Sequence, residues 1–480
     1  MSVVVAFLFG TLMIMNILLA VVVVFLERRN VSATWAWLLV LSFIPVLGFI
    51  IYLLFGRNLS HKKIFTWDRQ SRLRMRRLVT AQKEGLIERA KCDPLIAEYR
   101  ELIRMHLNQD QAVLTYHNDL EIYTDGKSKF DALLADLEKA EDHIHLLYYI
   151  VRDDHLGQQI GAVLERKARE GVSVRLLYDD LGSRGLSKRF IRMLRKAGGE
   201  VEAFFPSRLR WINPRMNYRN HRKLVVIDGK TGYIGGFNIG DEYLGSNPRF
   251  GFWRDTHLRI QGGAVHSLQA RFVLDWNQAS HRNLSFQDYY YPEPFEHGDV
   301  NAQIISSGPD AECEQIKNGY IKMILSAKRY IYIQTPYFIP DDSLLDALRI
   351  AVTSGIDVRV MIPDKPDHPF VYWATYSYLG ELLRIGGRVY IYRNGFLHAK
   401  TIVVDDKIAS VGTANIDVRS FRLNFEVNAF LYHEGTAKCL ADVFHEDMML
   451  STPLTLEKYM ERSLTIRLKE SVSRLVSPIL

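Results

Sequence analysis

Residues 220–238 read NHRKLVVIDGKTGYIGGFN, and residues 397–415 repeat the same pattern of residues as LHAKTIVVDDKIASVGTAN. In both stretches a histidine is followed by a lysine two positions later, an aspartate five positions after that, a glycine seven further on and an asparagine three beyond. The shared residues are His221, Lys223, Asp228, Gly235 and Asn238 in the first stretch and His398, Lys400, Asp405, Gly412 and Asn415 in the second. One such pattern arises by chance in a chain of this length with a probability on the order of 1 in 10,000, so two copies indicate an internal duplication.

The size and charge of the chain limit what it can be. Its 480 residues suffice for two or three domains with buried cores. Its three cysteines, Cys92, Cys313 and Cys439, are far apart and form no CxxC pair, which argues against a disulfide framework and a thiolate zinc site. The net charge of +7 and the pI near 9.0 favour an anionic partner: nucleic acid, a phosphorylated substrate or an anionic membrane surface.

Two apolar runs predict an N-terminal transmembrane helical hairpin over residues 1–56. The helices are expected at about 3–26 and 35–55, and each run is long enough to cross the core of a bilayer. Aromatic residues near the ends of the second run, Trp35, Trp37 and Tyr52, suit the membrane interface. The alternatives are a cleaved signal peptide, against which the length of the first run and its start without a basic residue argue, and a hairpin buried in a globular domain.

Basic residues around the two runs indicate the orientation of the hairpin. The linking loop holds only Arg28 and Arg29, whereas the segment after the second run is far richer in basic residues. These are Arg57, Lys62, Lys63, Arg69, Arg72, Arg74, Arg76 and Arg77. Because the more basic flank stays in the cytoplasm, we predict a multi-pass membrane protein with the rest of the chain cytoplasmic. The basic segment would then face anionic headgroups, or form the solvated face of a helix.

The repeat extends beyond the motif and predicts the fold class. Residues 140–180 and 327–364 each read as an apolar strand, an amphipathic helix, a turn glycine and a second apolar strand. This alternation predicts an α/β fold of two domains, each a mixed β-sheet flanked by helices, in a pseudo-twofold arrangement. We expect a basic helical connector over 57–110, a first domain over 111–295 and a second over 296–480. The last eighteen residues, SLTIRLKESVSRLVSPIL, read as a helix that packs on the second domain or contacts the membrane.

The motif itself predicts a β-hairpin that presents a histidine and a lysine together. KLVVID is a strand, and DGK is a turn before TGYIGG. Because side chains alternate along a strand, His221 and Lys223 share a face, and Asp228 lies on the other face near the turn. We therefore expect His and Lys to meet a substrate, and Asp to hold the hairpin or a neighbouring backbone. The amides of Asn238 and Asn415 would donate to an oxyanion.

Two converging copies of the motif fit phosphodiester chemistry. They supply two imidazoles, two ammonium groups and two amides, whereas a single histidine on a strand is more often a structural residue. A lysine beside each histidine and the lack of further ligands at suitable spacing argue against a metal. A nucleophile, an acid for the leaving oxygen and positive charge for the phosphoryl oxygens are all present. The candidate catalytic set is His221, Lys223, Asp228, His398, Lys400 and Asp405.

The duplicated H-x-K-x4-D motif resembles that of the phospholipase D superfamily. The strings NYRNHRKLVVIDG, GGFNIGDEYLG, FWRDTH, FLHAKT, GTANID and RSFRLNFE, together with the apolar hairpin, resemble its bacterial cardiolipin synthase branch over essentially the whole chain. The resemblance implies two phospholipase D-like domains and a place in the bacterial cell membrane. Where the first motif has Gly235 and Gly236, the second has Gly412 and Thr413, a variation that the superfamily tolerates.

The resemblance also implies a reaction and the roles of residues in it. One phosphatidylglycerol would donate its phosphatidyl group to another through a phosphatidyl-histidine intermediate, giving cardiolipin and glycerol without a cofactor. His221 would be the nucleophile and His398 the acid and base, while Lys223, Lys400, Asn238 and Asn415 would neutralise the phosphate. Asp255 and Glu426 would each orient a histidine. Two histidines in opposite protonation states predict a bell-shaped pH profile.

Three other functions are compatible with parts of the sequence. A hydrolase of the same superfamily would pass the phosphatidyl group to water and release phosphatidic acid. A nuclease would explain the basic pI, but the apolar runs and the lack of a recognisable nucleic-acid module argue against nucleic acid as a partner. An inactive scaffold that binds anionic lipid is disfavoured by two intact motifs.

Overall fold

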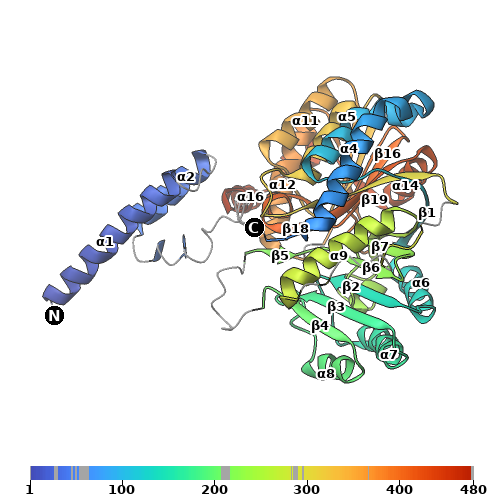
Figure 1. Cartoon of the computed structure of the whole chain (residues 1–480). Coiled ribbons are helices and arrows are strands. Elements are labelled where there is room, and N and C mark those ends of the chain that lie inside the picture. Colours follow the sequence, from blue (N-terminus) through green and yellow to red (C-terminus); the bar gives the residue numbers. More distant parts are fainter. Residues whose placement is uncertain are drawn as a thin grey trace.

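The chain is seen in a computed structural model that describes residues 2–25, 31–44, 47–48, 51–52, 64–206, 217–282, 284, 290–293, 297–365 and 367–476. Two apolar helices, α1 (Ser2–Phe25) and α2 (Val31–Phe43), extend as an arm from one side of the body (Figure 1). They touch, because the side-chain amide of Asn16 donates to the carbonyl of Leu41. Within the described residues, no helix combines the length and apolar character that crossing a membrane requires. The spans expected at 3–26 and 35–55 include residues outside this description, so the membrane hairpin stays a prediction.

Two helices occupy most of the segment expected to be a connector. The side chains of Asp68 and Asp93 cap the first turns of α4 (Arg69–Cys92) and α5 (Pro94–Gln109). Leu102, on the apolar face of α5, is buried in the core of the second domain. The connector therefore packs on the second domain, although the first domain follows it directly in the sequence.

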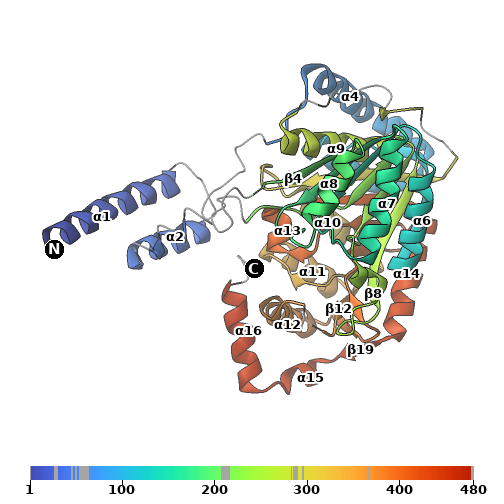
Figure 2. The same ribbon diagram turned by 90° about the horizontal axis from the view of Figure 1, so that it is seen from below.

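The first half of the chain forms one mixed sheet. Its strand order is β4-β3-β2-β6-β7-β8-β1, with β2, β3 and β4 parallel and the remaining pairs antiparallel. The strands are β1 (Thr115–Asp125), β2 (His143–Tyr148), β3 (Ser173–Asp179), β4 (Glu200–Phe204), β5 (Arg219–Asn220), β6 (Leu224–Ile227), β7 (Thr231–Gly235) and β8 (Trp253–Gln261). The helices are α6 (Gly126–Glu138), α7 (His155–Arg169), α8 (Lys188–Lys196), η1 (Asp241–Leu244) and α9 (Ala264–Ser280). Helices α6, α7 and α8 lie side by side along one face of this sheet (Figure 2).

The second half repeats this order. Its sheet runs β19-β13-β12-β10-β15-β16-β18-β9, and β10, β12 and β13 are parallel like β2, β3 and β4. The strands are β9 (Val300–Ser307), β10 (Tyr330–Gln334), β11 (Phe338–Ile339), β12 (Asp357–Pro363), β13 (Arg388–Tyr392), β14 (Phe396–Leu397), β15 (Thr401–Val404), β16 (Ile408–Gly412), β17 (Ile416–Asp417), β18 (Asn424–Tyr432) and β19 (Ser451–Leu454). The helices are α10 (Gln315–Ser326), α11 (Asp342–Thr353), α12 (Pro369–Arg384), α13 (Val418–Arg422), α14 (Glu434–Met449), α15 (Leu456–Met460) and α16 (Leu464–Val476). The mixed α/β fold predicted from the duplicated pattern is confirmed.

The two sheets share a core and are joined by hydrogen-bonded strands. Side chains of β6, β7 and β8 pack with those of β15, β16 and β18 in one buried cluster, which also takes in α9 and α14. β1 pairs with β9 at the sheet edges. Two further pairs cross between the halves: β5 runs parallel to β18, and β14 runs parallel to β8. These two short crossings matter for function because each ends at a motif histidine.

Candidate active site

Each motif folds as the hairpin that its sequence predicts, on β6–β7 and on β15–β16. Asp228 lies at the first turn with φ of 54°, and its carboxylate accepts the backbone N–H groups of Glu141, Asp142 and His143, each at 2.9 Å. Asp405, with φ of 57°, accepts three N–H groups in the same way from residues 328–330. These contacts fix the starts of β2 and β10. Both aspartates thus hold the backbone beside their hairpins, and among the described residues neither carboxylate is hydrogen-bonded to a motif histidine. Their place in the catalytic set stays a prediction.

The short strand crossings bring each histidine to the opposite domain. The backbone N–H of His221 donates to the carbonyl of Phe425 at 2.9 Å, and that of His398 donates to the carbonyl of Arg254 at 2.7 Å. The residue after each acceptor is a fully buried carboxylate, Glu426 or Asp255. The chain is thus built so that a histidine of one domain meets a carboxylate of the other.

The side chains complete this crossed arrangement. Nδ1 of His221 lies 2.9 Å from Oε2 of Glu426, and Nδ1 of His398 lies 2.6 Å from Oδ2 of Asp255. A carboxylate at Nδ1 holds the proton there and fixes the ring orientation. Nε2 of each imidazole is then the nitrogen left for chemistry.

The two motif lysines lie beside the histidines. Nζ of Lys223 donates to the carbonyl of His221 at 2.7 Å, and Nζ of Lys400 donates to the carbonyl of His398. Both ammonium groups are buried, without a carboxylate within ion-pair distance among the described residues. Burial lowers the pKa of Lys223 to about 7 and that of Lys400 to about 8. An anion placed between the lysines would restore their charge.

Burial and the lysines also set the protonation of the histidines. Burial lowers the pKa of His221, against the opposing charge of Glu426. Burial, reinforced by Lys400, lowers the pKa of His398 to about 4, although Asp255 opposes it. Burial disfavours the charged forms of Glu426 and Asp255, but the neighbouring His and Lys cations outweigh it, so their pKa values lie below the usual range. At neutral pH the site therefore holds two neutral imidazoles and two carboxylates.

The surroundings of the two carboxylates differ. The hydroxyl of Thr413 donates to Glu426, and the amide of Asn424 lies 3.2 Å from the same carboxylate. On the other side Gly236 occupies the position of Thr413, and a Cβ there would lie 1.9 Å from Oδ1 of Asp255. Asp255 is held instead by the backbone N–H of Thr256 at 2.7 Å.

The two motif asparagines are engaged with the protein. Asn238 accepts from the N–H of Ile150, and its amide donates to the hydroxyl of Tyr243. Asn415 is buried beside Asp417: burial raises the pKa of that carboxyl to about 6, and the hydrogen bond from Asn415 opposes the rise. The Oδ1 atom of Asn415 has no hydrogen-bond partner among the described residues. Their predicted phosphate contacts stay a prediction.

Sequence reasoning missed Tyr149, which shapes the site together with Trp253 and Arg222. The ring of Tyr149 meets His221 with centroids 4.8 Å apart, and Trp253 lies 5.3 Å from His398. Arg222 is buried and binds Asp275, the carbonyl of Glu426 and the hydroxyl of Ser306. A tyrosine directly after the first buried strand was a visible signal, whereas the role of Arg222 depends on contacts between domains.

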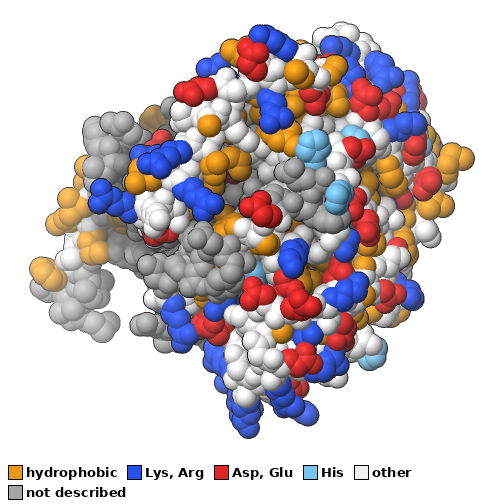
Figure 3. Space-filling view, turned by 45° about the vertical axis from the view of Figure 1, so that its right-hand side comes forward, with side chains coloured by type: hydrophobic (Ala, Val, Ile, Leu, Met, Phe, Trp, Pro, Cys, Tyr) orange, Lys and Arg blue, Asp and Glu red, His pale blue; other side chains and the backbone are white. Residues whose placement is uncertain are grey.

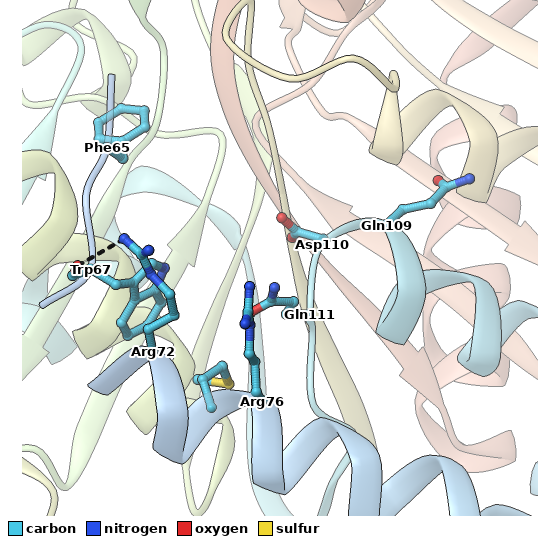
Figure 4. A pocket seen from close by; sticks show the side chains of 8 residues that line it. Phe65, Trp67, Arg72, Arg76, Gln109, Asp110 and Gln111 are labelled. Atoms are coloured by element: carbon cyan, nitrogen blue, oxygen red, sulfur yellow. Dashed lines mark hydrogen bonds between the residues drawn. The ribbon is translucent and has the colours of Figure 1, made fainter. Parts of the chain in front are cut away.

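A pocket of about 350 Å³ lies where the connector meets the body. Figure 4 shows Arg76 of α4 pointing toward Gln111 and Asp110. Asp110 accepts the N–H of Ser306, whose hydroxyl contacts Arg222, and burial raises the pKa of Asp110 to about 7. The connector is therefore linked to the strand that carries Glu426.

Comparisons with known proteins agree with this geometry. The family described as "Cardiolipin synthase, PLD-like domain" matches residues 133–253 and 320–448, and the family described as "Phospholipase_D-nuclease N-terminal" matches residues 14–57. The chain is 62% identical to the major cardiolipin synthase of Bacillus subtilis over 97% of this chain and 98% of that protein. It is 56% identical to the cardiolipin synthase of Oceanobacillus iheyensis over 98% and 99% of the two chains. The fold is similar to that of phosphatidylserine synthase from Haemophilus influenzae, with a TM-score of 0.62 and 15% identity over 80% of this chain and all of that one.

Proposed function

The chain belongs to the cardiolipin synthase family of phospholipase D-like enzymes, and we propose that it transfers a phosphatidyl group from one phosphatidylglycerol to another, giving cardiolipin and glycerol. The observation that carries the chemistry is the crossed pairing of His221 with Glu426 and of His398 with Asp255. It supports one composite site in which each domain supplies half of the machinery.

In the first step, Nε2 of His221 attacks the phosphorus of the first lipid. The N–P bond forms while the bond from phosphorus to the glycerol oxygen breaks. Glu426 stabilises the positive charge that develops on the ring of His221. His398 gives its proton to the leaving glycerol oxygen.

His398 needs a proton for this step, although burial lowers its pKa to about 4. A phosphodiester carries one negative charge, which raises the pKa of a neighbouring imidazole. Asp255 adds to this effect on the other side of the ring. Substrate binding and protonation of His398 are thus coupled, because the site takes up a proton when it binds the lipid.

In the second step, neutral His398 removes the proton from the terminal hydroxyl of a second phosphatidylglycerol. That oxygen attacks phosphorus and the N–P bond to His221 breaks, which releases cardiolipin. Lys223 and Lys400 neutralise the phosphoryl oxygens in both steps. One phosphodiester replaces another, so the reaction is reversible and uses no nucleotide.

The substrates are phospholipids, so the site must work at a membrane. We propose that the N-terminal helices α1 and α2 anchor the enzyme in the bacterial cell membrane as a hairpin, with both phospholipase D-like domains on the cytoplasmic side. The apolar side chains of Phe7, Ile14 and Ile17 are more than half exposed, which supports a lipid environment for α1. The heavier basic flank after the second helix supports the orientation.

Purified full-length protein in phosphatidylglycerol micelles tests the reaction. Cardiolipin and glycerol in equal amounts are expected. Phosphatidic acid as the main product would instead support hydrolysis, a reading that the names of the relatives do not favour. Acid quenching of the reaction with phosphate-labelled lipid, followed by peptide mapping, is expected to place the label on His221.

A further inference from the structure

The C-terminal helix α16 packs by one side on α12. Glu470 and Ser473 face inward and are buried. The guanidinium of Arg462 holds Glu470 with two contacts of 2.7 and 2.9 Å, and Arg474 pairs with Glu381 of α12. The predicted packing on the second domain therefore accounts for one face of this helix.

The opposite face of α16 is apolar and exposed. Leu464 and Leu475 are 81% exposed, Leu468 is 65% exposed and Val472 is 47% exposed. The spacing of these residues, four, four and three, places them in one stripe along the helix. A stripe of four large apolar side chains on the outer face is not needed for folding, which points to a partner outside the chain.

The charges around this stripe are almost all basic. Arg467 and Lys469 are exposed on α16, and the one acidic residue of the helix, Glu470, is buried in its ion pair. A groove of about 240 Å³ between α12 and α16 is lined by four arginines and one glutamate: Arg384, Arg462, Arg467, Arg474 and Glu470. Arg462 and Arg474 are paired with Glu470 and Glu381, which leaves Arg384 and Arg467 as the basic residues of the groove without an ion pair among the described residues. By contrast, the face that Figure 3 brings forward mixes acidic and basic side chains. An apolar stripe with a basic border fits an anionic lipid surface.

The position of α16 agrees with this assignment. In both ribbon views, α16 lies on the side of the body from which the arm of α1 and α2 extends (Figures 1 and 2). The N-terminus of α12, against which α16 packs, adds Phe370, which is 58% exposed. A bilayer that holds the arm would thus lie on the side that displays the stripe.

We propose that α16 is a second membrane contact, which lays Leu464, Leu468, Val472 and Leu475 into the interface of an anionic bilayer while Arg467 and Lys469 meet phosphate groups. A second copy of the chain is a poorer occupant. Two such stripes would bring like charges together, and a helix of 13 residues offers far less than the roughly 800 Å² per partner of a stable interface. The C-terminal helix then holds the catalytic domains against the lipid surface, in addition to the N-terminal anchor.

Depth-dependent quenching in proteoliposomes tests the proposal without relying on activity. The full chain, with its three exposed cysteines replaced by serine, carries one fluorophore at Leu468→Cys or, as a control, at Gln159→Cys on α7. Nitroxide groups on the acyl chains of phosphatidylglycerol-containing vesicles are expected to quench the label at 468 and to leave the label at 159 unaffected. Equal quenching at both positions, or none at 468, would overturn the proposal.

A charge substitution gives a second, functional measurement. Leu468→Glu is expected to lower turnover on anionic vesicles by about threefold to tenfold, because it removes an apolar contact with the bilayer and adds a negative charge next to anionic headgroups, and to leave turnover in detergent micelles unchanged. Leu325→Glu on α10, 52% exposed in the wild type, is the matched control with no expected effect on either. Equal losses in vesicles and micelles would assign the stripe to folding and contradict the proposal. A change in the oligomeric state of Leu468→Glu, with unchanged quenching of a label at Leu475→Cys, would assign the stripe to contact with a second copy and also contradict it.

Discussion

The His221 site and the His398 site share a backbone frame but differ in what surrounds the carboxylate. In both, a two-residue strand crosses to the other domain and ends at a histidine whose N–H binds the residue before an acid. Glu426 is longer and takes a hydroxyl from Thr413, whereas Asp255 is shorter and lies against Gly236, where no side chain fits. The comparison shows that the duplicated motif accounts for the shared backbone frame, whereas the residues beside the two carboxylates give the two histidines different surroundings.

The largest effect is expected from replacing either motif histidine, which removes its Nε2. In His221→Asn and His398→Asn the amide keeps a donor near the carboxylate but offers no nucleophile or base, so cardiolipin synthesis falls by roughly 10⁴-fold or more. The two variants separate with a lipid whose leaving group is p-nitrophenolate, which needs no acid. A burst of nitrophenol from the His398 variant and none from the His221 variant is expected. The reverse result would exchange the two roles.

Next in size are the carboxylates. Glu426→Gln and Asp255→Asn keep the shape of the side chains but no longer stabilise an imidazolium, so turnover falls by about 10²- to 10⁴-fold. Because the pairs are crossed, Glu426→Gln should slow labelling of His221 with every lipid, whereas Asp255→Asn should slow it with phosphatidylglycerol but not with the p-nitrophenolate lipid, which needs no acid. Quenched-flow kinetics with the two labelled lipids measures both. Loss of the label from the p-nitrophenolate lipid in the Asp255 variant alone would contradict the crossed assignment.

The residues beside the acids should matter to unequal degrees. Gly236→Ala places a methyl group on Asp255 and moves it away from His398, so activity falls by roughly 10²-fold, as expected for a misplaced catalytic group. Thr413→Val removes one hydrogen bond to Glu426 and costs about fivefold to tenfold, equivalent to about 1 to 1.4 kcal/mol. Thr413→Ser, which keeps the hydroxyl, is the control. Steady-state assays in micelles rank the three variants, and equal effects of Gly236→Ala and Thr413→Val would remove the difference between the sites.

The smallest effect is a shift of the pH profile. His221 must be neutral to attack, and its pKa lies below the usual 6.5, so the acidic limb of kcat/KM should fall below pH 6.5. The alkaline limb should begin between pH 7 and 8 as Lys223 and Lys400 lose their protons, whose pKa values are about 7 and about 8. A profile without an acidic limb would contradict attack by neutral His221, and one without an alkaline limb would contradict the role of the two lysines.

The same shifts predict stability. Below about pH 6.5 the unfolded chain takes up protons on these histidines and the native chain does not until lower pH, so the free energy of unfolding decreases as the pH falls, by at most about 1.4 kcal/mol per pH unit for each histidine. For His398 this loss should continue to about pH 4. Denaturant titrations of the wild type and His398→Asn measure the difference.

The sequence predicts what depends on local order. Alternation of apolar residues gives the strands, and the even spacing of His221 and Lys223 places them on one face because strand geometry is local. The odd spacing between His221 and Asp228 predicted that Asp228 holds the hairpin or a neighbouring backbone, although Asp228 was also counted among the catalytic candidates. The mixed α/β fold follows from the same alternation of strands and helices.

The sequence could not predict what depends on contact between the halves. The crossings β5–β18 and β14–β8 involve two residues each, which leaves no periodic signal. Asp255 and Glu426 could be named from family resemblance, but not matched to a histidine. Arg222 reads as an exposed cation in the motif, and only the position of Asp275 on α9 explains its burial.

The crossed pairing also determines when, during synthesis of the chain, the paired site can form. A growing polypeptide exposes residue 221 long before residue 426 has left the ribosome. During that interval His221 lacks Glu426, and Asp255 lacks His398. The two histidine–carboxylate pairs can therefore form only after the second domain has folded against the first.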